Sequence, residues 1–460
     1  MQKVTRNPTL GTTVKITAGK AYFSLKVLIF AVALLLLGTT LDRPGTARGE
    51  GVTQNSGSVG AVNVRGEDSV HGGSAEQNAG VARFGAGAGS GGTTKLAGLS
   101  AQNAGFRFPA RQEENDSVSV IMVGDILLHD RVLENCRNDD GSYSFSSIFA
   151  GTKSLISRAD ISIVNQEVII GGAELGVSGY PRFNAPYEIA DSLVDAGFNL
   201  ICHATNHAVD KGKQGILNCL NYWSKNYPEI SVVGLYRTKE DSEKIYIYEK
   251  NGMKIAVLNY TLHTNYLSLP ADMKYAVNLL EEKKVRADLE KAKSLADFII
   301  VCPHWGVEYS YEVSAAQRNW CKIFMEYGVG LVIGTHPHVI QPIEMLTDDV
   351  TGKKMLVYYS LGNFVNWTSN TDENCANQFV GGLADVELAK AADGSVFVKE
   401  YSVKPVVCHV SDEKNGITVY FLASYSRQKA EKNAIKKQDS SFSYEYCTAL
   451  AKRIWPQFVE

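Results

Sequence analysis

The sequence has little net charge and few cysteines. Its 46 basic and 49 acidic residues leave a formal charge of −3, so it lacks the basic excess typical of nucleic-acid-binding proteins. Its eight cysteines are scattered and include no CxxC pair, which excludes a zinc ribbon and a dense disulfide framework. The spacing does not exclude that some of these cysteines form individual disulfides if the domain lies outside the cell. Cys202 and Cys302, however, fall in strands predicted to be buried, where cysteine usually acts as a small apolar residue.

The N-terminal region carries an export signal. Residues 1–26 contain five basic residues and no acid, and Val27–Leu37 is an unbroken run of eleven apolar residues. A basic flank before such a run is typical of a signal peptide or an uncleaved anchor. Because no A-x-A site follows, we favour an anchor over residues 21–41, with residues 1–20 as a basic cytoplasmic tail. Either interpretation puts the rest of the chain outside the cytoplasm, so we expect a single-pass protein of the cell membrane.

Residues 42–116 have the composition of a linker. Sixteen glycines lie between Arg43 and Asn115, together with many Ser, Ala, Asn and Thr. Such a segment buries too little apolar surface to offset its ordering entropy, so we predict that it is disordered. It would act as a flexible tether between the membrane and a folded domain.

A strand–helix–strand unit lies between Phe298 and Glu344. Phe298–Val301 and Gly330–Ile333 are apolar runs of strand length. Residues 314–328 between them have apolar residues at helical spacing, and Gly328 is placed to end that helix. This order predicts two parallel strands joined by a right-handed crossover.

The pattern continues from residue 117 to residue 410, which we predict to be one α/β domain. Residues 411–460 are amphipathic and charged, and we expect a partly helical C-terminal extension. We predict strands over 117–123, 161–164, 199–202, 231–234, 254–260 and 355–359, helices over 145–158, 187–196, 216–223 and 287–295, and alternating β structure over 378–410.

Potential metal ligands follow five of these strands. They are Asp125, Glu167, Asn206 with His207, His304, and His336 with His338. The carboxyl ends of strands in open α/β sheets are where ligands bind. Oxygen and imidazole donors without thiolate suit Mn, Fe or Zn. Each group has an ordinary alternative, such as a turn, a helix cap or a satisfied histidine, but the joint pattern predicts a metal centre.

The motifs resemble the CapA family, named for poly-γ-glutamate capsule synthesis, within the calcineurin-like metallophosphoesterase superfamily. The resemblance rests on GDILLHDR (124–131), NQE (165–167), TNHAVD (205–210), HWGVEY (304–309), GTHPHV (334–339) and YSLGNF (359–364). It implies a β-sandwich flanked by helices. It also implies a site for two divalent metals held by Asp125, Glu167, Asn206, His304, His336 and His338.

The sequence departs from the superfamily pattern at the first motif. Many superfamily enzymes have Asp-x-His there, whereas this chain has Leu127. His129 lies two residues further on, and whether it compensates stays open. The number of bound metals, one or two, therefore also stays open.

The leading functional hypothesis is a membrane-tethered metallohydrolase that acts on a capsule or cell-envelope polymer. His207 would be the general acid, oriented by Asp210, and Arg182, Trp305, Glu308 and Asn363 would lie around the substrate. The alternative is a non-catalytic accessory of poly-γ-glutamate export or assembly, working with other capsule-synthesis proteins through a metal-stabilised fold. A secreted α/β domain of unrelated function is the least favoured. An anionic poly-glutamate, a phosphoester and a peptidoglycan fragment all remain possible substrates.

Overall fold

A computed structural model describes residues 117–369 and 374–459 of the chain. The predicted cytoplasmic tail (1–20), anchor (21–41) and linker (42–116) lie outside these residues. Within the described ranges, no helix has both the length and the apolar character needed to span a bilayer.

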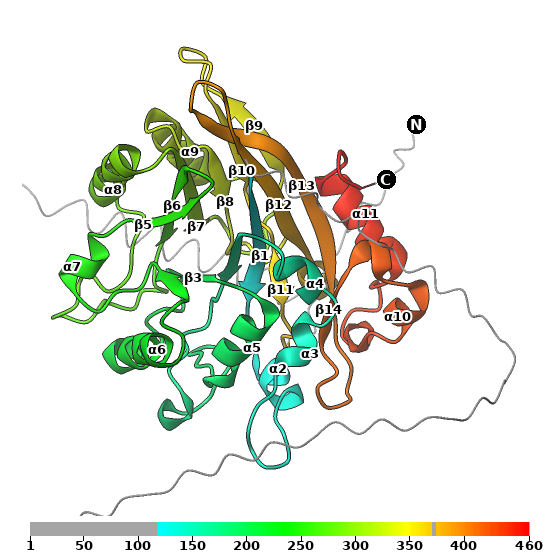
Figure 1. Cartoon of the computed structure of the whole chain (residues 1–460). Coiled ribbons are helices and arrows are strands. Elements are labelled where there is room, and N and C mark those ends of the chain that lie inside the picture. Colours follow the sequence, from blue (N-terminus) through cyan, green and yellow to red (C-terminus); the bar gives the residue numbers. More distant parts are fainter. Residues whose placement is uncertain (1–116, 370–373, 460) are drawn as a thin grey trace, which may run out of the picture. The chain divides into compact units, whose positions relative to one another are not determined.

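One sheet has eight strands and contains the first strand of the domain. Its order is β14-β13-β12-β1-β2-β3-β4, and β11 pairs with β1 (Figure 1). The strands are β1 (Ser117–Ile126), β2 (Ile161–Asn165), β3 (Leu200–Cys202), β4 (Ser231–Val233), β11 (Asn363–Val365), β12 (Val380–Lys390), β13 (Val396–His409) and β14 (Thr418–Phe421). The run from β1 to β4 is parallel, and β12 to β14 are antiparallel.

The other sheet has six strands in the order β5-β6-β7-β8-β10-β9. They are β5 (Tyr246–Lys250), β6 (Met253–Thr261), β7 (Phe298–His304), β8 (Leu331–Ile333), β9 (Ile343–Thr347) and β10 (Lys354–Tyr358). The four central strands are parallel and the two edge strands are antiparallel. The predicted parallel pair, β7 and β8, is confirmed, and the described part of the chain has a mixed α/β fold.

The helices are α2 (Asp130–Asn135), α3 (Ser146–Phe149), α4 (Lys153–Ile156), α5 (Glu188–Ala196), α6 (Gly212–Asn226), α7 (Lys239–Ser242), α8 (Glu282–Leu295), α9 (Ala315–Glu326), α10 (Arg427–Glu431) and α11 (Tyr444–Ile454). The helices up to α9 lie in connections between strands, and α10 and α11 follow the last strand, β14. The α9 crossover helix begins at a capping box formed by Ser314 and Gln317, and Gly328 follows its end at a φ of 78°. The capping box fixes the start of the helix, and Gly328 fixes its end as the sequence predicts.

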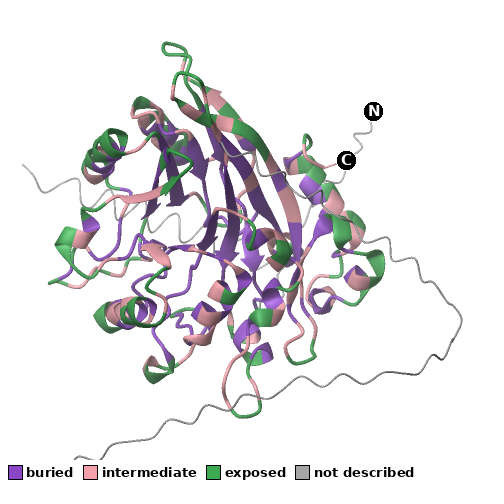
Figure 2. Ribbon diagram, viewed as in Figure 1, coloured by how far each residue is buried: buried purple, intermediate pink, exposed green. Residues whose placement is uncertain are grey.

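Alternate residues of the second sheet face two different cores. On β7, Ile300 and Cys302 belong to the large cluster that also contains the strands of the first sheet. Ile299 and Val301 belong to a smaller cluster with residues of α8 and α9. Because successive strand residues point to opposite faces, one face of this sheet packs toward the first sheet and the other is covered by helices. Figure 2 shows the strands of both sheets as largely buried.

One predicted helix was wrong in extent. The helix expected over 145–158 is two short helices, α3 and α4, separated at Ala150–Thr152. At this break a Cβ on Gly151 would lie 2.4 Å from the carbonyl oxygen of Val419 in β14. The chain therefore bends where its backbone packs against a strand that is far away in sequence. The strands β5, β9, β11 and β14 were not predicted from the sequence.

The eight cysteines all lie in described parts of the chain. They are buried and form no disulfide. The thiols of Cys202 and Cys302 sit in neighbouring parts of the core, where burial raises the pKa of Cys202 well above its ordinary value. These cysteines act as apolar core residues, as the sequence predicts.

Candidate metal centre

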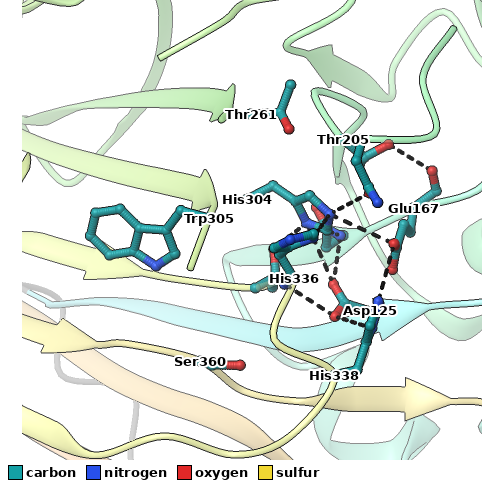
Figure 3. Close-up of polar contacts among 12 residues, drawn as sticks. Asp125, Glu167, Thr205, Thr261, His304, Trp305, His336, His338 and Ser360 are labelled. Carbon is teal, nitrogen blue, oxygen red and sulfur yellow. Dashed lines mark hydrogen bonds and ion pairs between the residues drawn. The ribbon is translucent and has the colours of Figure 1, made fainter. Parts of the chain in front are cut away.

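Parallel strands from both sheets bring the predicted ligands to one place. Asp125 is the penultimate residue of β1, Glu167 follows β2 by two residues, and His304 is the last residue of β7. His336 and His338 follow β8. All five side chains are buried, and in Figure 3 they converge on one point. The carboxyl ends of the strands therefore form a single buried polar cluster.

The glycine of the first motif is required by close packing. A Cβ on Gly124 would lie 1.8 Å from the carbonyl oxygen of Gly362, so a side chain at position 124 would collide with the backbone before β11. The next backbone N–H, that of Asp125, donates to the same carbonyl oxygen at 3.0 Å. This contact fixes the end of β1 and therefore the position of the Asp125 carboxylate.

The loop after β8 holds two histidines in an unusual backbone conformation. His336 has a φ of 97° and His338 a φ of 59°, values that residues other than glycine seldom adopt. The backbone N–H of His336 donates to Oδ2 of Asp125 at 3.2 Å. Strained backbone of this kind persists where the surrounding structure fixes it, and it clusters at functional sites.

Glu167 lies between two imidazoles. Its Oε1 is 3.7 Å from Nε2 of His304 and also 3.7 Å from Nε2 of His338. On the far side of these rings, Nδ1 of His338 is 3.3 Å from Oδ2 of Asp125, and Nδ1 of His304 is 3.7 Å from Oδ1 of Asp125. The two carboxylates therefore flank both imidazoles.

Three groups of donor atoms in the described chain are close enough to hold a cation. Within each group the donor atoms lie within 4.8 Å of one another. The groups are Asp125, Glu167 and His338; Glu167, His304 and His336; and Glu308, His336 and His338. The first two share Glu167, as expected of a carboxylate that bridges two adjacent positions.

A divalent cation fits this cluster because the Glu167 carboxylate is otherwise unsatisfied. Both of its oxygens are buried, and neither has a hydrogen-bond donor among the described residues. Burial raises the pKa of Glu167, although His338 and His207 oppose that effect. A buried carboxylate without a partner is costly, whereas a metal ion would satisfy both oxygens.

The histidines are poised to act as neutral donors. Burial lowers the pKa of His304 to about 3 and that of His336 well below its ordinary value. Neutral imidazole is the form that binds metals. For His338, burial also lowers the pKa, but the Glu167 and Asp125 carboxylates outweigh it and raise the pKa to about 10. A bound cation would compete with the proton on that ring.

The motif after β3 contributes an amide to the cluster. Oδ1 of Asn206 lies 2.8 Å from Nε2 of His304, so the amide oxygen and the imidazole nitrogen aim at the same region. Thr205 Oγ1 donates to the backbone carbonyl of Glu167 at 2.7 Å, which ties the loops after β2 and β3 together. The structure thus places all six predicted metal ligands in one cluster.

His207 and Asp210 form a separate pair beside these donors. Nδ1 of His207 is 2.7 Å from Oδ2 of Asp210, and that oxygen also accepts from the backbone N–H of Phe183 at 2.8 Å. The Phe183 ring packs edge-on against the imidazole at 4.5 Å. These contacts leave Nε2 of His207 facing the Asn265 amide at 3.4 Å. Among the described residues, His207 belongs to none of the three donor groups.

Of the residues expected around the substrate, two are exposed and one is buried behind the metal ligands. Arg182 is exposed, directly before Phe183, and Glu308 is exposed with its carboxylate beside His336 and His338. Asn363 is buried behind the ligands, where its Oδ1 lies 2.9 Å from Nδ1 of His338.

Trp305 does not line the site, which corrects the expectation from the sequence. Its side chain is only 1% exposed and packs with Phe324 and Tyr359 in the smaller core cluster. Its Nε1 donates to the carbonyl oxygen of Tyr359 at 3.0 Å. Figure 3 shows the ring turned away from the ligands. Trp305 follows His304 directly, so it points to the opposite face of the sheet.

His129 does not replace the missing histidine among the donor groups. No group of described donors includes it, and Leu127 is buried in the core. The His129 ring packs at 5.1 Å from that of Phe183. Burial lowers the pKa of His129 to about 3, with further contributions from His338 and His207, so it lies near the cluster as a neutral neighbour.

Sequence reasoning missed two residues on the loop after β6. The His263 ring is 5.3 Å from the His336 ring, and Asn265 contacts both Asn206 and His207 through its amide. The position of these residues in the chain could have identified them. They follow β6, which is parallel to β7, so the carboxyl end of β6 lies at the same edge of the sheet as His304. Residues after Tyr260 could have been added on that basis.

Comparisons with known proteins agree on one family. The family model described as "Bacterial capsule synthesis protein PGA_cap" matches residues 119–368, more than half of the 460 residues. The chain is 28% identical over 284 residues to the PGA biosynthesis protein CapA of Bacillus subtilis, covering 56% of this chain and 66% of that protein. It is 26% identical over 285 residues to the capsule biosynthesis protein CapA of Bacillus anthracis, covering 57% and 64%.

The chain thus spans less than two thirds of the length of these two curated relatives. Among solved structures, the NAD nucleotidase of Haemophilus influenzae is similar at a TM-score of 0.40 and 15% identity, covering 73% of this chain and 67% of that one. A likeness this weak supports no conclusion about function.

Proposed function

The chain belongs to the bacterial capsule synthesis protein PGA_cap family, and on that premise we propose that it is a metal-dependent hydrolase acting on a capsule or cell-envelope polymer. The proposed fold is the calcineurin-like metallophosphoesterase fold. Two sheets that share a core, with donors gathered at the ends of parallel strands, support that assignment.

The shared position of Glu167 is the observation that carries the proposal. Two divalent ions, Mn, Fe or Zn, would bind on either side of it. Asp125, Glu167 and His338 would hold one ion, and Glu167, Asn206, His304 and His336 would hold the other. Bound divalent ions at such sites activate a water and neutralise developing charge.

His207 would act on the leaving group. Asp210 occupies its Nδ1, which orients the ring and leaves Nε2 available to hold and donate a proton. Phe183 packs against the ring and keeps it in this orientation. Arg182 and Glu308 would lie at the mouth of the site, where both side chains are exposed.

A non-catalytic accessory role is the second candidate, and Leu127 favours it. Where many superfamily enzymes carry a second histidine, this chain has a buried leucine. The group around Asp125 then has three carboxylate or histidine donors among the described side chains. A structural or half-occupied metal site would suit a protein that holds the polymer or another capsule-synthesis protein without cleaving a bond.

We also propose that residues 21–41 anchor the chain in the cell membrane and that residues 42–116 tether an extracytoplasmic domain. The basis is the apolar run after a basic flank. Fractionation of cells that make the full chain tests the anchor: recovery in the membrane pellet supports it, and release into the medium favours a cleaved signal.

Metal content and turnover together test the hydrolase. The purified full-length chain would be loaded with Mn²⁺ and offered poly-γ-glutamate, a generic phosphodiester and a peptidoglycan fragment. The proposal expects bound metal by elemental analysis and turnover of at least one substrate class that is lost on chelation. Full metal loading with no turnover of any of the three substrate classes would favour the accessory role.

A further inference from the structure

One of the three donor groups reaches the surface of the molecule. The two groups that share Glu167 are entirely buried, and we call them the inner groups. The third, which we call the outer group, consists of Glu308, His336 and His338, and Glu308 is its exposed member. The proposed function places ions in the inner groups, so it leaves the outer group without a role.

The backbone next to Glu308 is held against the loop that carries the two histidines. The N–H of Tyr309 donates at 2.8 Å to the carbonyl oxygen of Pro337, which lies between those histidines in the sequence. A Cβ on Gly306 would lie only 3.1 Å from Cγ of the same proline. Tyr309 has a φ of 62°, which a bulky residue adopts only where the surrounding structure fixes it. These contacts keep the Glu308 carboxylate beside the histidines.

Solvent reaches this region more easily than it reaches the inner groups. Every donor residue of the inner groups is at most 4% exposed, whereas Glu308 is exposed. A cavity of about 730 Å³ also lies beside the metal centre, and its lining includes Tyr309, Val339 and Arg453. The Tyr309 ring in this lining is 6.0 Å from the His338 ring. A hydrated ion can therefore approach Glu308 from solvent.

The outer group overlaps with each inner group by one histidine. It shares His338 with the inner group around Asp125, and His336 with the inner group around His304. A cation in the outer group could thus move to either inner position with one imidazole still bound, exchanging the Glu308 carboxylate for that of Glu167. Such an exchange keeps the ion coordinated, whereas a charge that entered the interior without ligands would be strongly unfavourable.

We propose that the outer group is the entry position for the divalent ions of the buried centre. Glu308 would be a transient ligand, which binds the ion first and releases it once the inner donors hold it. It would therefore set the rates at which metal enters and leaves, and not the affinity of the inner groups. The inference rests on the metal centre of the proposed function, but on no particular reaction.

Uptake of Zn²⁺ by the metal-free full-length chain tests this role. Stopped-flow mixing with a chromogenic Zn²⁺ indicator measures the uptake rate, and elemental analysis after dialysis measures the metal content at equilibrium. Glu308→Gln should slow uptake by at least about tenfold, within the range by which charged entrances change association rates, and should keep the wild-type content. Extraction by a chelator should slow by the same factor, because the affinity is the ratio of the two rates.

Two further variants separate a ligand from a distant charge. Glu312→Gln is the matched control, since it makes the same charge change at another exposed position of the same segment, and it should take up Zn²⁺ at the wild-type rate. Glu308→Asp keeps the charge but shortens the side chain, so uptake should again be slower than in the wild type. It also carries the test if Glu308→Gln does not fold.

Three outcomes would overturn the entry position. They are equal uptake rates for wild type and Glu308→Gln, a wild-type rate for Glu308→Asp, and loss of metal from Glu308→Gln at equilibrium, which would make Glu308 a permanent ligand. A wild-type chain that binds no Zn²⁺ would remove the proposed metal centre as well. Glu308-dependent uptake by a chain without turnover would retain the entry position and remove only the hydrolase.

Discussion

Glu167 shows how a single residue reports on a missing partner. Its carboxylate is completely buried, it comes no closer than 3.7 Å to the imidazoles of His304 and His338, and no hydrogen bond within the described residues satisfies it. A folded protein retains such a group only when something else compensates the burial. Two donor groups share this carboxylate, so a cation on each side is the compensation that we propose.

Replacing Glu167 with Gln should separate folding from metal binding. Without metal, the Glu167→Gln protein should be as stable as the wild type or more stable, because the unsatisfied carboxylate is gone. With metal, only the wild type should gain stability, by about 2.7 kcal/mol at a metal concentration one hundred times Kd. Thermal unfolding with and without Mn²⁺ measures both effects.

Glu134→Gln on the exposed face of α2 is the control, and it should respond to metal like the wild type. A Glu167→Gln protein that is stabilised by metal to the same extent as the wild type would show that Glu167 is not a ligand.

His207→Ala should leave metal content near that of the wild type and lower turnover by roughly 10² to 10⁴, the usual contribution of a positioned general acid. The reason is that His207 lies outside the described donor groups and is held by Asp210. His304→Ala should instead lose metal and stability together. The substrate should have an alkyl leaving group, because an activated aryl leaving group needs little protonation. Loss of metal from His207→Ala would make it a ligand.

The ligands could be predicted from the sequence, but the side-chain directions next to them could not. A histidine or carboxylate within three residues of the end of a predicted buried strand is enough to identify Asp125, Glu167 and His304. Trp305 is predicted at the same site only because it follows His304. Its true position depends on which strand residue faces the helices, and on the carbonyl oxygen of Tyr359 that accepts from its indole. The direction of the Trp305 side chain is therefore set by packing against residues that are distant in the sequence.

At the scale of elements, Asp160 joins three strands near the start of the first sheet. Its Oδ2 accepts from the backbone N–H of Ser119 at 2.9 Å and from the Ser119 hydroxyl at 3.0 Å. Its Oδ1 accepts from Lys250 of β5 at 2.5 Å. Partial burial opposes ionisation, but the Lys250 and Ser119 hydrogen bonds prevail and lower the pKa of Asp160. This residue therefore links β1 to the strand that follows it and to the second sheet.

Asp160→Asn should reduce the free energy of unfolding at pH 7 by roughly 1 kcal/mol, at the low end for a charged hydrogen-bonded group because solvent screens a half-buried site. The folded-state pKa is lowered, so the contribution of the carboxylate is complete above the ordinary Asp value of about 3.9. It is lost as the pH falls toward the lowered value. Urea unfolding measures the free energy of unfolding at pH 7 and near pH 3. The difference in this free energy between wild type and Asp160→Asn should be smaller near pH 3 than at pH 7.

Asp349→Asn, at an exposed position, should match the wild type at both pH values. A difference between wild type and Asp160→Asn that persisted unchanged at low pH would mean that the contribution does not come from the ionised carboxylate.

Elements with strong local signals were predicted well, and elements fixed by distant partners were not. The α9 helix carries a capping box and a terminal glycine, and its span agrees with the prediction. By contrast, β14 is a four-residue strand that pairs with β13, and the same region bends the chain at Gly151. The bend has no local signature, because it depends on a contact between residues more than two hundred positions apart.

At the scale of the whole molecule, the C-terminal residues are part of the main core. The segment after residue 410 supplies β14 to the first sheet, and Cys447, Leu450 and Trp455 to the large core cluster. Arg453 on the same helix lines the cavity beside the metal centre. The segment after residue 410 thus adds an edge strand to the first sheet and side chains to the large core cluster. It also lines the cavity beside the metal centre.

Replacing Trp455 tests whether the segment after residue 410 stabilises the fold. The Trp455 side chain is fully buried, its Nε1 donates to the carbonyl oxygen of Gln341 at 2.8 Å, and its ring lies where a Cβ on Gly382 would be only 2.6 Å away. Trp455→Ala should therefore cost about 3–5 kcal/mol of unfolding free energy, whereas Trp320→Ala, at a half-buried position on α9, should cost clearly less.

A chain that ends at residue 410 should fail to unfold cooperatively, because it exposes the edge of β13 and the core side of the large cluster. Urea unfolding followed by tryptophan fluorescence measures the point variants, and calorimetry measures the truncation. Cooperative unfolding of the truncated chain with normal metal binding would show that the tail is an independent addition. In that case the other hydrogen bonds of Gln341, which lies three residues after His338, would be enough to hold the metal-binding loop: its N–H donates to the carbonyl oxygen of Ser360, and its side chain accepts from Gln317.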